Sequence, residues 1–204
     1  MALEIARHDE EWGQIVIELD EANAPQTVRN FLRYVDEGYY NGTLFHRALA
    51  GFIVQGGGYA VLNELKKAGV RGPISNEAAN GLKNVRGTIA MAHGKDPQSA
   101  TTQFFINLKD NPALDFPGEH GWYCCVFGRV IAGLEIVDRI AGVPTQPNPQ
   151  WPKENSQPID PPLVKRAVRL GAQDTARPIT PAGLQPSKPG IPPHGGPAAT
   201  TRSP

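Results

Sequence analysis

Hydrophobic positions alternate with polar ones near the N-terminus and then recur at helical spacing. Residues 14–19 place Ile15, Ile17 and Leu19 on one face, which predicts a half-buried strand. A helix is predicted to begin at Pro25, because proline is favoured in the first helical turn, and to end at Gly38. Its apolar residues at helical spacing are Val28, Phe31, Leu32 and Val35.

Further apolar runs, separated by turns that contain glycine or proline, predict more strands. They occupy residues 52–55, 88–92, 103–107 and 124–130. A second helix is predicted over 134–141, with Leu134, Val137 and Ile140 on one stripe and Gly142 at its end. Many short strands with two clear helices indicate a mainly antiparallel β protein, either a sandwich or a barrel.

The composition changes after Gly142, because 15 of the 20 prolines follow it. Residues 143–162 also carry Trp151 and Ile159, so we expect a long ordered loop that leads to a last strand over 163–170. The remainder has too few large apolar side chains to offset the entropy of ordering, and disorder is expected. The predicted organisation is one folded domain, residues 1–172, and a Pro/Gly-rich tail, residues 173–204.

Charge and hydropathy narrow the class of protein. Lysine plus arginine equals aspartate plus glutamate, at 20 each, so no net charge draws the chain toward nucleic acid. No stretch approaches the about 20 apolar residues of a membrane span, and the N-terminus lacks the pattern of a secretory signal. We expect a cytoplasmic protein without nucleic-acid or membrane partners; a leader removed before residue 1 would leave no trace.

The two cysteines, Cys124 and Cys125, are adjacent. Neighbours on a strand point to opposite faces, so a disulfide between them is geometrically disfavoured. Two thiols cannot form a cysteine-rich zinc cluster, and His8, His120 and His194 show no metal-like spacing. We expect the cysteines to be small apolar residues on a buried strand.

Several unusual segments follow one another in a fixed order. They are Phe45-His46-Arg47, residues 51–57 (GFIVQGG), Asn76-Glu77, residues 87–92 (GTIAMA), residues 103–107 (QFFIN) and residues 126–130 (VFGRV). Together they resemble the cyclophilin family over roughly residues 13–143, and residues 76–84 look like its bacterial branch. The resemblance implies an eight-stranded antiparallel β-barrel closed by two α-helices. It also implies peptidyl-prolyl cis-trans isomerase activity in an outer groove that binds proline-containing polypeptides, with no metal or organic cofactor.

The reaction explains why an arginine is a suitable catalyst. Rotation about an X-Pro bond has a barrier of about 18–20 kcal/mol and breaks no covalent bond. The catalyst must therefore bind the twisted amide better than either planar form. A fixed donor aimed at the proline nitrogen does so, and guanidinium presents several N–H groups in a rigid plane. Arg47 occupies the matching position of the family motif and is the predicted catalytic residue.

The resemblance assigns the other site residues. Phe52 and Gln55 join Arg47 in the predicted catalytic set, and Gln55 and Gln103 hold substrate carbonyls and brace the arginine. Phe52, Ile53, Phe105 and Leu114 match the apolar socket for the proline ring. Ala92, His93 and Gly94 match the groove edge that pairs with peptide backbone. Because Phe104 and Phe105 point to opposite faces of a strand, we expect Phe105 to face the groove.

Two positions depart from the family pattern. Ala113 stands where many members carry tryptophan or phenylalanine, and Cys124 stands where a histidine or tyrosine would line the proline pocket. We expect weak cyclosporin binding and some loss of substrate affinity, by about 1 kcal/mol, with activity reduced rather than absent. Trp122 is a candidate to refill part of the gap.

Other interpretations stay open. We expect the chain to be a monomer. As a binding module, its groove could hold proline-containing segments with little turnover. Alternatively, the barrel could be one part of a larger assembly. His46 is expected to be a structural partner of Arg47 rather than a base. The run Gly56-Gly57-Gly58 lacks the pattern of a nucleotide loop and predicts a tight turn. X-Pro sequences of the tail could enter the groove, although a simple solvated extension is the alternative.

Overall fold

A computed structural model of the chain describes residues 1–118 and 123–171. The predicted tail, residues 173–204, and Trp122 lie outside the described residues. Within these residues no helix is long and apolar enough to cross a membrane.

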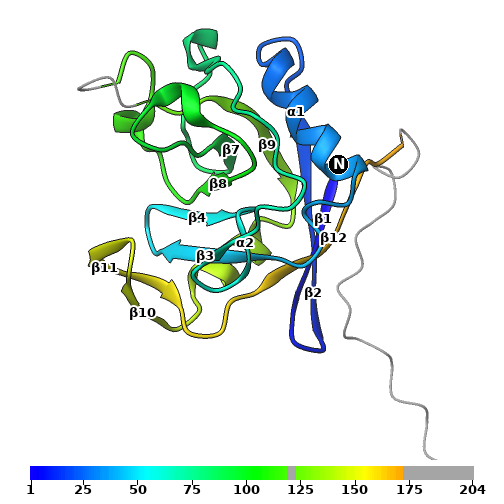
Figure 1. The fold of residues 1–204 in the computed structure, drawn as a ribbon, viewed down its shortest axis with the longest axis vertical. Coiled ribbons are helices and arrows are strands. Elements are labelled where there is room, and N and C mark those ends of the chain that lie inside the picture. The colour runs from blue at the N-terminus through cyan, green and yellow to red at the C-terminus, as the bar shows by residue number, and fades with distance from the viewer. Residues whose placement is uncertain (119–122, 172–204) are drawn as a thin grey trace, which may run out of the picture.

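Eight antiparallel strands form a closed barrel in the order β1-β12-β3-β4-β8-β7-β9-β2 (Figure 1). The barrel is closed by β1 (Ala2–Arg7), which pairs with both β2 and β12. This arrangement confirms the predicted eight-stranded barrel. The other barrel strands are β2 (Glu10–Leu19), β3 (Thr43–Leu49), β4 (Ile53–Gly56), β7 (Thr88–Met91), β8 (Phe104–Asn107), β9 (Val126–Ala132) and β12 (Leu163–Val168).

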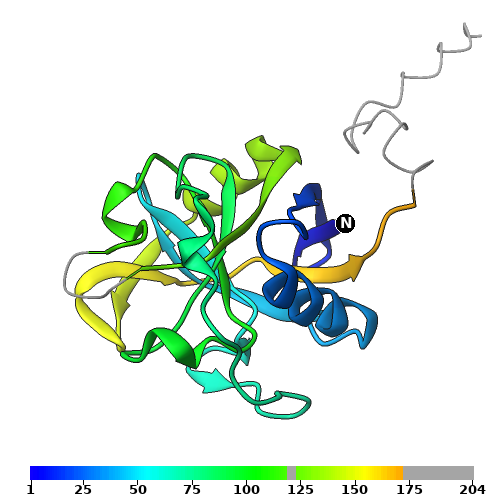
Figure 2. The same ribbon diagram turned by 90° about the horizontal axis from the view of Figure 1, so that it is seen from above.

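Two α-helices in the described residues cover the barrel, as predicted. Helix α1 (Pro25–Asp36) packs beside β12, and α2 (Leu134–Ala141) packs against β2, β3 and β4 (Figure 2). The N-terminus of α1 has no capping side chain of its own; instead Glu77 accepts hydrogen bonds from the backbone N–H groups of Gln26 and Thr27. The Asn76-Glu77 motif thus fixes the first turn of a helix far away in the sequence.

Strand alternation separates two hydrophobic clusters. Val54, Phe104, Ile106 and Cys125 face the large core inside the barrel. Their neighbours Ile53, Phe105 and Cys124 belong to a smaller cluster that also contains Ala90 and Val126. The prediction that Phe105 and Phe104 point to opposite sides is therefore confirmed. Both cysteines are buried and free, without a disulfide.

The prediction of a loop over residues 143–162 is wrong. Part of this segment forms a hairpin of two strands, β10 (Thr145–Asn148) and β11 (Trp151–Pro158), which packs beside β3 outside the barrel sheet (Figure 1). Its buried side chains are largely polar, among them Asn148, Ser156 and Gln157. A hairpin without alternating apolar residues leaves no periodic signal. A second small sheet pairs β5 (Tyr59–Val61) with β6 (Glu64–Leu65).

Strand ends differ from the predictions by a few residues. Strand β9 begins at Val126 rather than Cys124, because the backbone N–H of Cys124 donates to the carbonyl of Leu114 instead of to a neighbouring strand. Leu114 belongs to η3 (Pro112–Leu114); the described part of the chain also contains the 3₁₀ helices η1 (Ala78–Asn80) and η2 (Pro97–Ser99). Gly57 has a φ of +81°, and a Cβ there would lie 2.9 Å from Phe104. The triple glycine is not a tight turn, because Gly56 ends β4 and Gly57 and Gly58 form a bend; the unusual backbone angle that was expected is found at Gly57.

Candidate active site

A cavity of about 350 Å³ lies over the smaller hydrophobic cluster, outside the barrel core. The predicted site residues meet here although they come from segments far apart in the sequence. Of the predicted site residues, Gln103 and Ala113 do not line the cavity. Lys95 and Trp151 line it although they were not predicted. The lining residues are Arg47, Phe52, Ile53, Gln55, Ala92, His93, Gly94, Lys95, Phe105, Leu114, Cys124 and Trp151.

Arg47 reaches this cavity from β3, where it is paired in register with Gln55 on β4. Its side chain is only 10% exposed. The guanidinium Nη1 donates to Oε1 of Gln55 at 3.3 Å, and Nε2 of Gln55 donates to Oε1 of Gln103 at 2.9 Å. Gln103 therefore lies behind Gln55 and braces it, outside the cavity lining.

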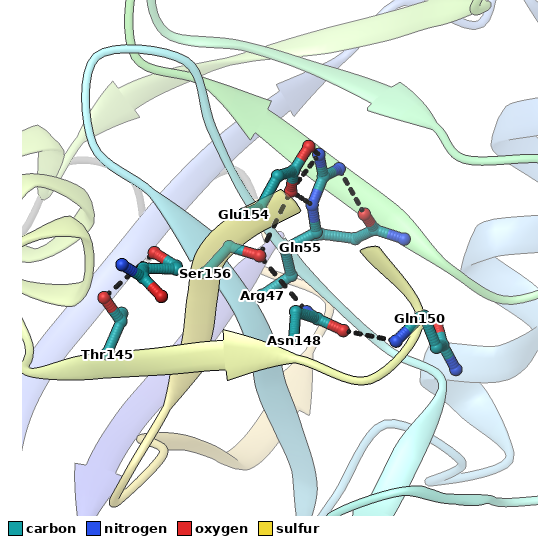
Figure 3. A network of polar contacts seen from close by, with 8 residues as sticks. Arg47, Gln55, Thr145, Asn148, Gln150, Glu154 and Ser156 are labelled. Atoms are coloured by element: carbon teal, nitrogen blue, oxygen red, sulfur yellow. Dashed lines mark hydrogen bonds and ion pairs between the residues drawn. The ribbon is translucent and has the colours of Figure 1, made fainter. Parts of the chain in front are cut away.

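The other side of the guanidinium contacts the hairpin that the sequence did not predict (Figure 3). Nε and Nη2 of Arg47 donate to the two carboxylate oxygens of Glu154, at 3.0 and 2.9 Å. The indole of Trp151 lies over the guanidinium, with the ring centroid 4.5 Å from Cζ. Neither residue was identified from the sequence, because each acts through a contact with a residue more than a hundred positions away.

The floor of the cavity is apolar. Ile53 and Phe105 are 3% exposed and belong to the smaller cluster, against which Phe52 and Leu114 pack. The ring of Phe52 lies 6.0 Å from Cζ of Arg47. An apolar surface thus lies next to the Arg47 guanidinium, some of whose N–H groups are already bonded. This arrangement suits a ligand that carries an apolar ring next to a polar amide bond.

His46 lies beside Arg47 in the sequence but does not line the cavity. It is buried, and its ring centroid is 4.3 Å from that of Tyr59. Burial lowers the pKa of His46 to about 4. A neutral ring held against Tyr59 favours the structural role expected for this residue.

A second, wider depression of about 580 Å³ lies between the end of β2 and residues 82–85. None of the predicted site residues lines it. Among residues 1–118 and 123–171, no three histidine, cysteine, aspartate or glutamate side chains are grouped as a metal site would require.

Comparison with known proteins agrees with this geometry. The family model for cyclophilin type peptidyl-prolyl cis-trans isomerases matches residues 3–164. The chain belongs to this family. It is 53% identical over 135 residues to peptidyl-prolyl cis-trans isomerase B of Escherichia coli, and this alignment covers 65% of the present chain and 81% of the relative. It is 45% identical over 161 residues to the peptidyl-prolyl cis-trans isomerase cyp18 of Streptomyces antibioticus, and this alignment covers 78% of the present chain and 94% of the relative.

Solved structures give the same assignment. A cyclophilin of Cryptosporidium parvum, determined in the presence of the dipeptide Ala-Pro, matches with a TM-score of 0.62 and 27% identity. The match covers 84% of this chain and 100% of the other. The present chain is thus a cyclophilin-type peptidyl-prolyl cis-trans isomerase whose relatives at 45–53% identity are bacterial.

The two departures from the family pattern have different structural outcomes in this cyclophilin. Cys124 lines the cavity, with Sγ 3.7 Å from Nε2 of His93, and burial raises the pKa of its thiol to about 12. At neutral pH it is thus a small, uncharged thiol in the pocket. Ala113 is exposed on η3 and does not line the cavity, so the structure gives no support to its predicted substrate contact.

The edge formed by Ala92, His93 and Gly94 is held by the ring of His93. Its Nδ1 lies 2.8 Å from the carbonyl oxygen of Gly94, and its Nε2 lies 2.8 Å from that of Tyr123. A neutral imidazole donates through only one nitrogen, so one of these contacts is a hydrogen bond in that state. The backbone of Ala92 is tied to β8 by its N–H, which donates to the carbonyl of Gln103 at 2.9 Å.

Proposed function

We propose that this cyclophilin accelerates rotation about X-Pro bonds because Arg47 stabilises the twisted amide, and that its substrates are extended proline-containing segments of client proteins. The observation that carries the proposal is the state of the guanidinium. It has five N–H groups. Its bonds to Glu154 and Gln55 use three of them. Among residues 1–118 and 123–171 the two that remain, one on each Nη, have no hydrogen-bond partner, and Arg47 lines the cavity together with the apolar floor.

The chemistry follows from this arrangement. As the amide twists, conjugation is lost and the proline nitrogen regains a lone pair, which a donor of Arg47 stabilises in a partly desolvated site. Phe52, Phe105 and Leu114 would hold the proline ring while the residue before it rotates. The peptide backbone would run along the edge at Ala92–Gly94. No base is needed, since no covalent bond breaks.

Isomerisation of an uncatalysed X-Pro bond takes tens to hundreds of seconds and limits the folding of many chains. A groove open to extended segments would act on such bonds before the client has folded. We therefore infer that the biological role is to assist protein folding. The structure of the Cryptosporidium parvum relative was determined in the presence of the dipeptide Ala-Pro, which supports a small X-Pro unit as the minimal substrate.

The test replaces Arg47 with alanine and follows cis-trans exchange of an Ala-Pro peptide by NMR. Loss of one preorganised donor in other enzymes lowers kcat about 10²–10³-fold, and we expect a decrease of this size. Arg47→Lys should recover little, because an ammonium lacks the rigid fork that Gln55 and Glu154 bind. Arg33→Ala, on an arginine exposed on α1, is the control.

Two results would contradict the proposal. Unchanged exchange in Arg47→Ala would remove the arginine from the mechanism. Tight binding of the peptide by the wild type without measurable exchange would instead indicate a binding module that uses the same groove.

A further inference from the structure

Glu154 is the one acidic side chain that contacts the guanidinium of Arg47 in the described structure. It comes from β11, outside the barrel, while Arg47 and Gln55 come from β3 and β4. The carboxylate binds the Nε–Nη2 edge through both oxygens, which is the geometry in which a carboxylate holds a guanidinium most rigidly. Its side chain is 27% exposed, so water screens this pair only in part.

The carboxylate is itself held by buried groups of the hairpin. Oγ of Ser156, which is fully buried, donates to Oε2 of Glu154 at 3.1 Å. Nδ2 of Asn148 donates to the same Oγ at 3.2 Å, and Oδ1 of Asn148 accepts from the backbone N–H of Gln150 at 2.9 Å. Figure 3 shows this chain of contacts running from the hairpin turn to the arginine.

The hairpin therefore restrains Arg47 in two directions at once. Glu154 fixes one edge of the guanidinium plane, and Trp151 lies against its face at 4.5 Å. Gln55 holds Nη1 from the barrel side. With these contacts in place, the two free N–H groups have one orientation. Without Glu154, the guanidinium would keep a single side-chain hydrogen bond, to Gln55, and would be able to rotate about its terminal torsions.

We propose that Glu154 is a positioning residue for the isomerase reaction: it acts on catalysis through Arg47, whose free donors it holds in the orientation the twisted amide requires. The inference rests on the proposed role of Arg47. Two other roles for Glu154 make different predictions. A purely structural pin for the hairpin would act independently of Arg47, and a brake that neutralises the cation would make its removal raise activity.

The experiment measures kcat/KM by NMR exchange and peptide Kd by titration for Glu154→Ala and Glu154→Gln, each with and without Arg47→Ala. A misplaced catalytic group costs about 10- to 100-fold, and we expect Glu154→Ala to fall in this range. The loss should appear in kcat while Kd changes less than about twofold, as for an interaction that matters in the transition state. Glu154→Gln keeps one acceptor and should recover part of the rate.

Epistasis separates positioning from a structural role. In the Arg47→Ala background, Glu154→Ala should cause no further loss, since there is no guanidinium left to orient. Lys153→Ala, an exposed neighbour on the same strand, is the matched control and should behave as wild type. The ¹⁵N signal of Arg47 Nε–H should be protected from exchange in the wild type and in Lys153→Ala, and lose this protection in Glu154→Ala.

Should Glu154→Ala unfold the hairpin, Ser156→Ala provides a second test. It removes the donor to Glu154 and should lower kcat less than Glu154→Ala does, with the same epistasis. The inference is overturned if the Glu154 variants match wild type, if they are faster, or if they lose as much activity in the Arg47→Ala background as alone. In these cases a strong effect of Arg47→Ala leaves the proposed function intact; an inactive wild type or a harmless Arg47→Ala would overturn both.

Discussion

Replacing Trp151 with alanine tests whether the hairpin forms part of the substrate groove. The indole lies with its ring centroid 4.5 Å from Cζ of Arg47 and also lines the cavity. The substitution removes this face while leaving Glu154, Gln55 and the apolar floor in place. We expect kcat/KM for X-Pro peptides to fall, because the arginine loses a partner and the substrate loses a wall.

The magnitude follows from the burial of the two groups. A cation over an aromatic ring contributes about 0.5–1 kcal/mol at exposed sites and about 2 kcal/mol when desolvated. Arg47 is 10% exposed and Trp151 is half-buried, which places this pair at about 1–2 kcal/mol. That free energy corresponds to a decrease of about 5- to 30-fold in kcat/KM.

Two further variants divide this effect into its parts. Trp151→Phe keeps an aromatic face and should retain most of the activity, whereas Trp151→Leu keeps apolar area without the ring quadrupole and should resemble alanine more closely. NMR exchange on a proline peptide measures all three, and intact thermal unfolding shows that the barrel is preserved. Activity within twofold of wild type for Trp151→Ala would refute the assignment of this residue to the groove.

Two more predictions follow from the buried titratable groups. The pKa of His46 is about 4 in the folded protein against about 6.5 when unfolded, so the unfolded state binds the extra proton and stability falls as the pH drops from 6.5 toward 4. Between pH 7.5 and 4.5 the free energy of unfolding, measured with urea, should decrease by about 2–3 kcal/mol less in His46→Phe than in the wild type. If the two proteins lost the same stability over this pH range, the lowered pKa of His46 would be contradicted. With a thiol pKa of about 12, Cys124 should alkylate at pH 8 only on unfolding. Rapid labelling of the folded enzyme, followed by mass spectrometry, would disprove this.

The features that sequence reasoning located well share a local physical cause. Strand alternation alone separates Phe104 from Phe105, because successive side chains leave opposite faces of β8. Both helices were located because their apolar residues recur at helical spacing and proline or glycine marks their ends. The motif residues then meet in one cavity because β3, β4 and β8 are neighbours in the barrel.

The strands that were missed lack such a signal. Nearly all residues of β3 are buried, on both faces and including His46 and Arg47, so polar and apolar positions do not alternate. In β1 most residues are buried as well. The β10–β11 hairpin is rich in proline, and its buried residues are largely polar groups joined by side-chain hydrogen bonds, such as the one between Asn148 and Ser156. The periodicity of apolar residues cannot predict a hairpin whose packing depends on polar side chains.

The candidate site is built from two parts of the fold, the barrel strands and the β10–β11 hairpin. Ile53 and Phe105 in the floor of the cavity belong to barrel strands whose neighbouring side chains form the core on the opposite face, so a change in Phe105 disturbs Phe104 in the barrel. Trp151 and Glu154 stand on a hairpin outside that sheet. Position 113, where many family members carry an aromatic residue, is an exposed alanine that does not line the cavity, and Trp151 of the hairpin does line it. A change in the hairpin would therefore alter the cavity wall at Trp151 and the contacts of Arg47 while the barrel strands keep their pairing.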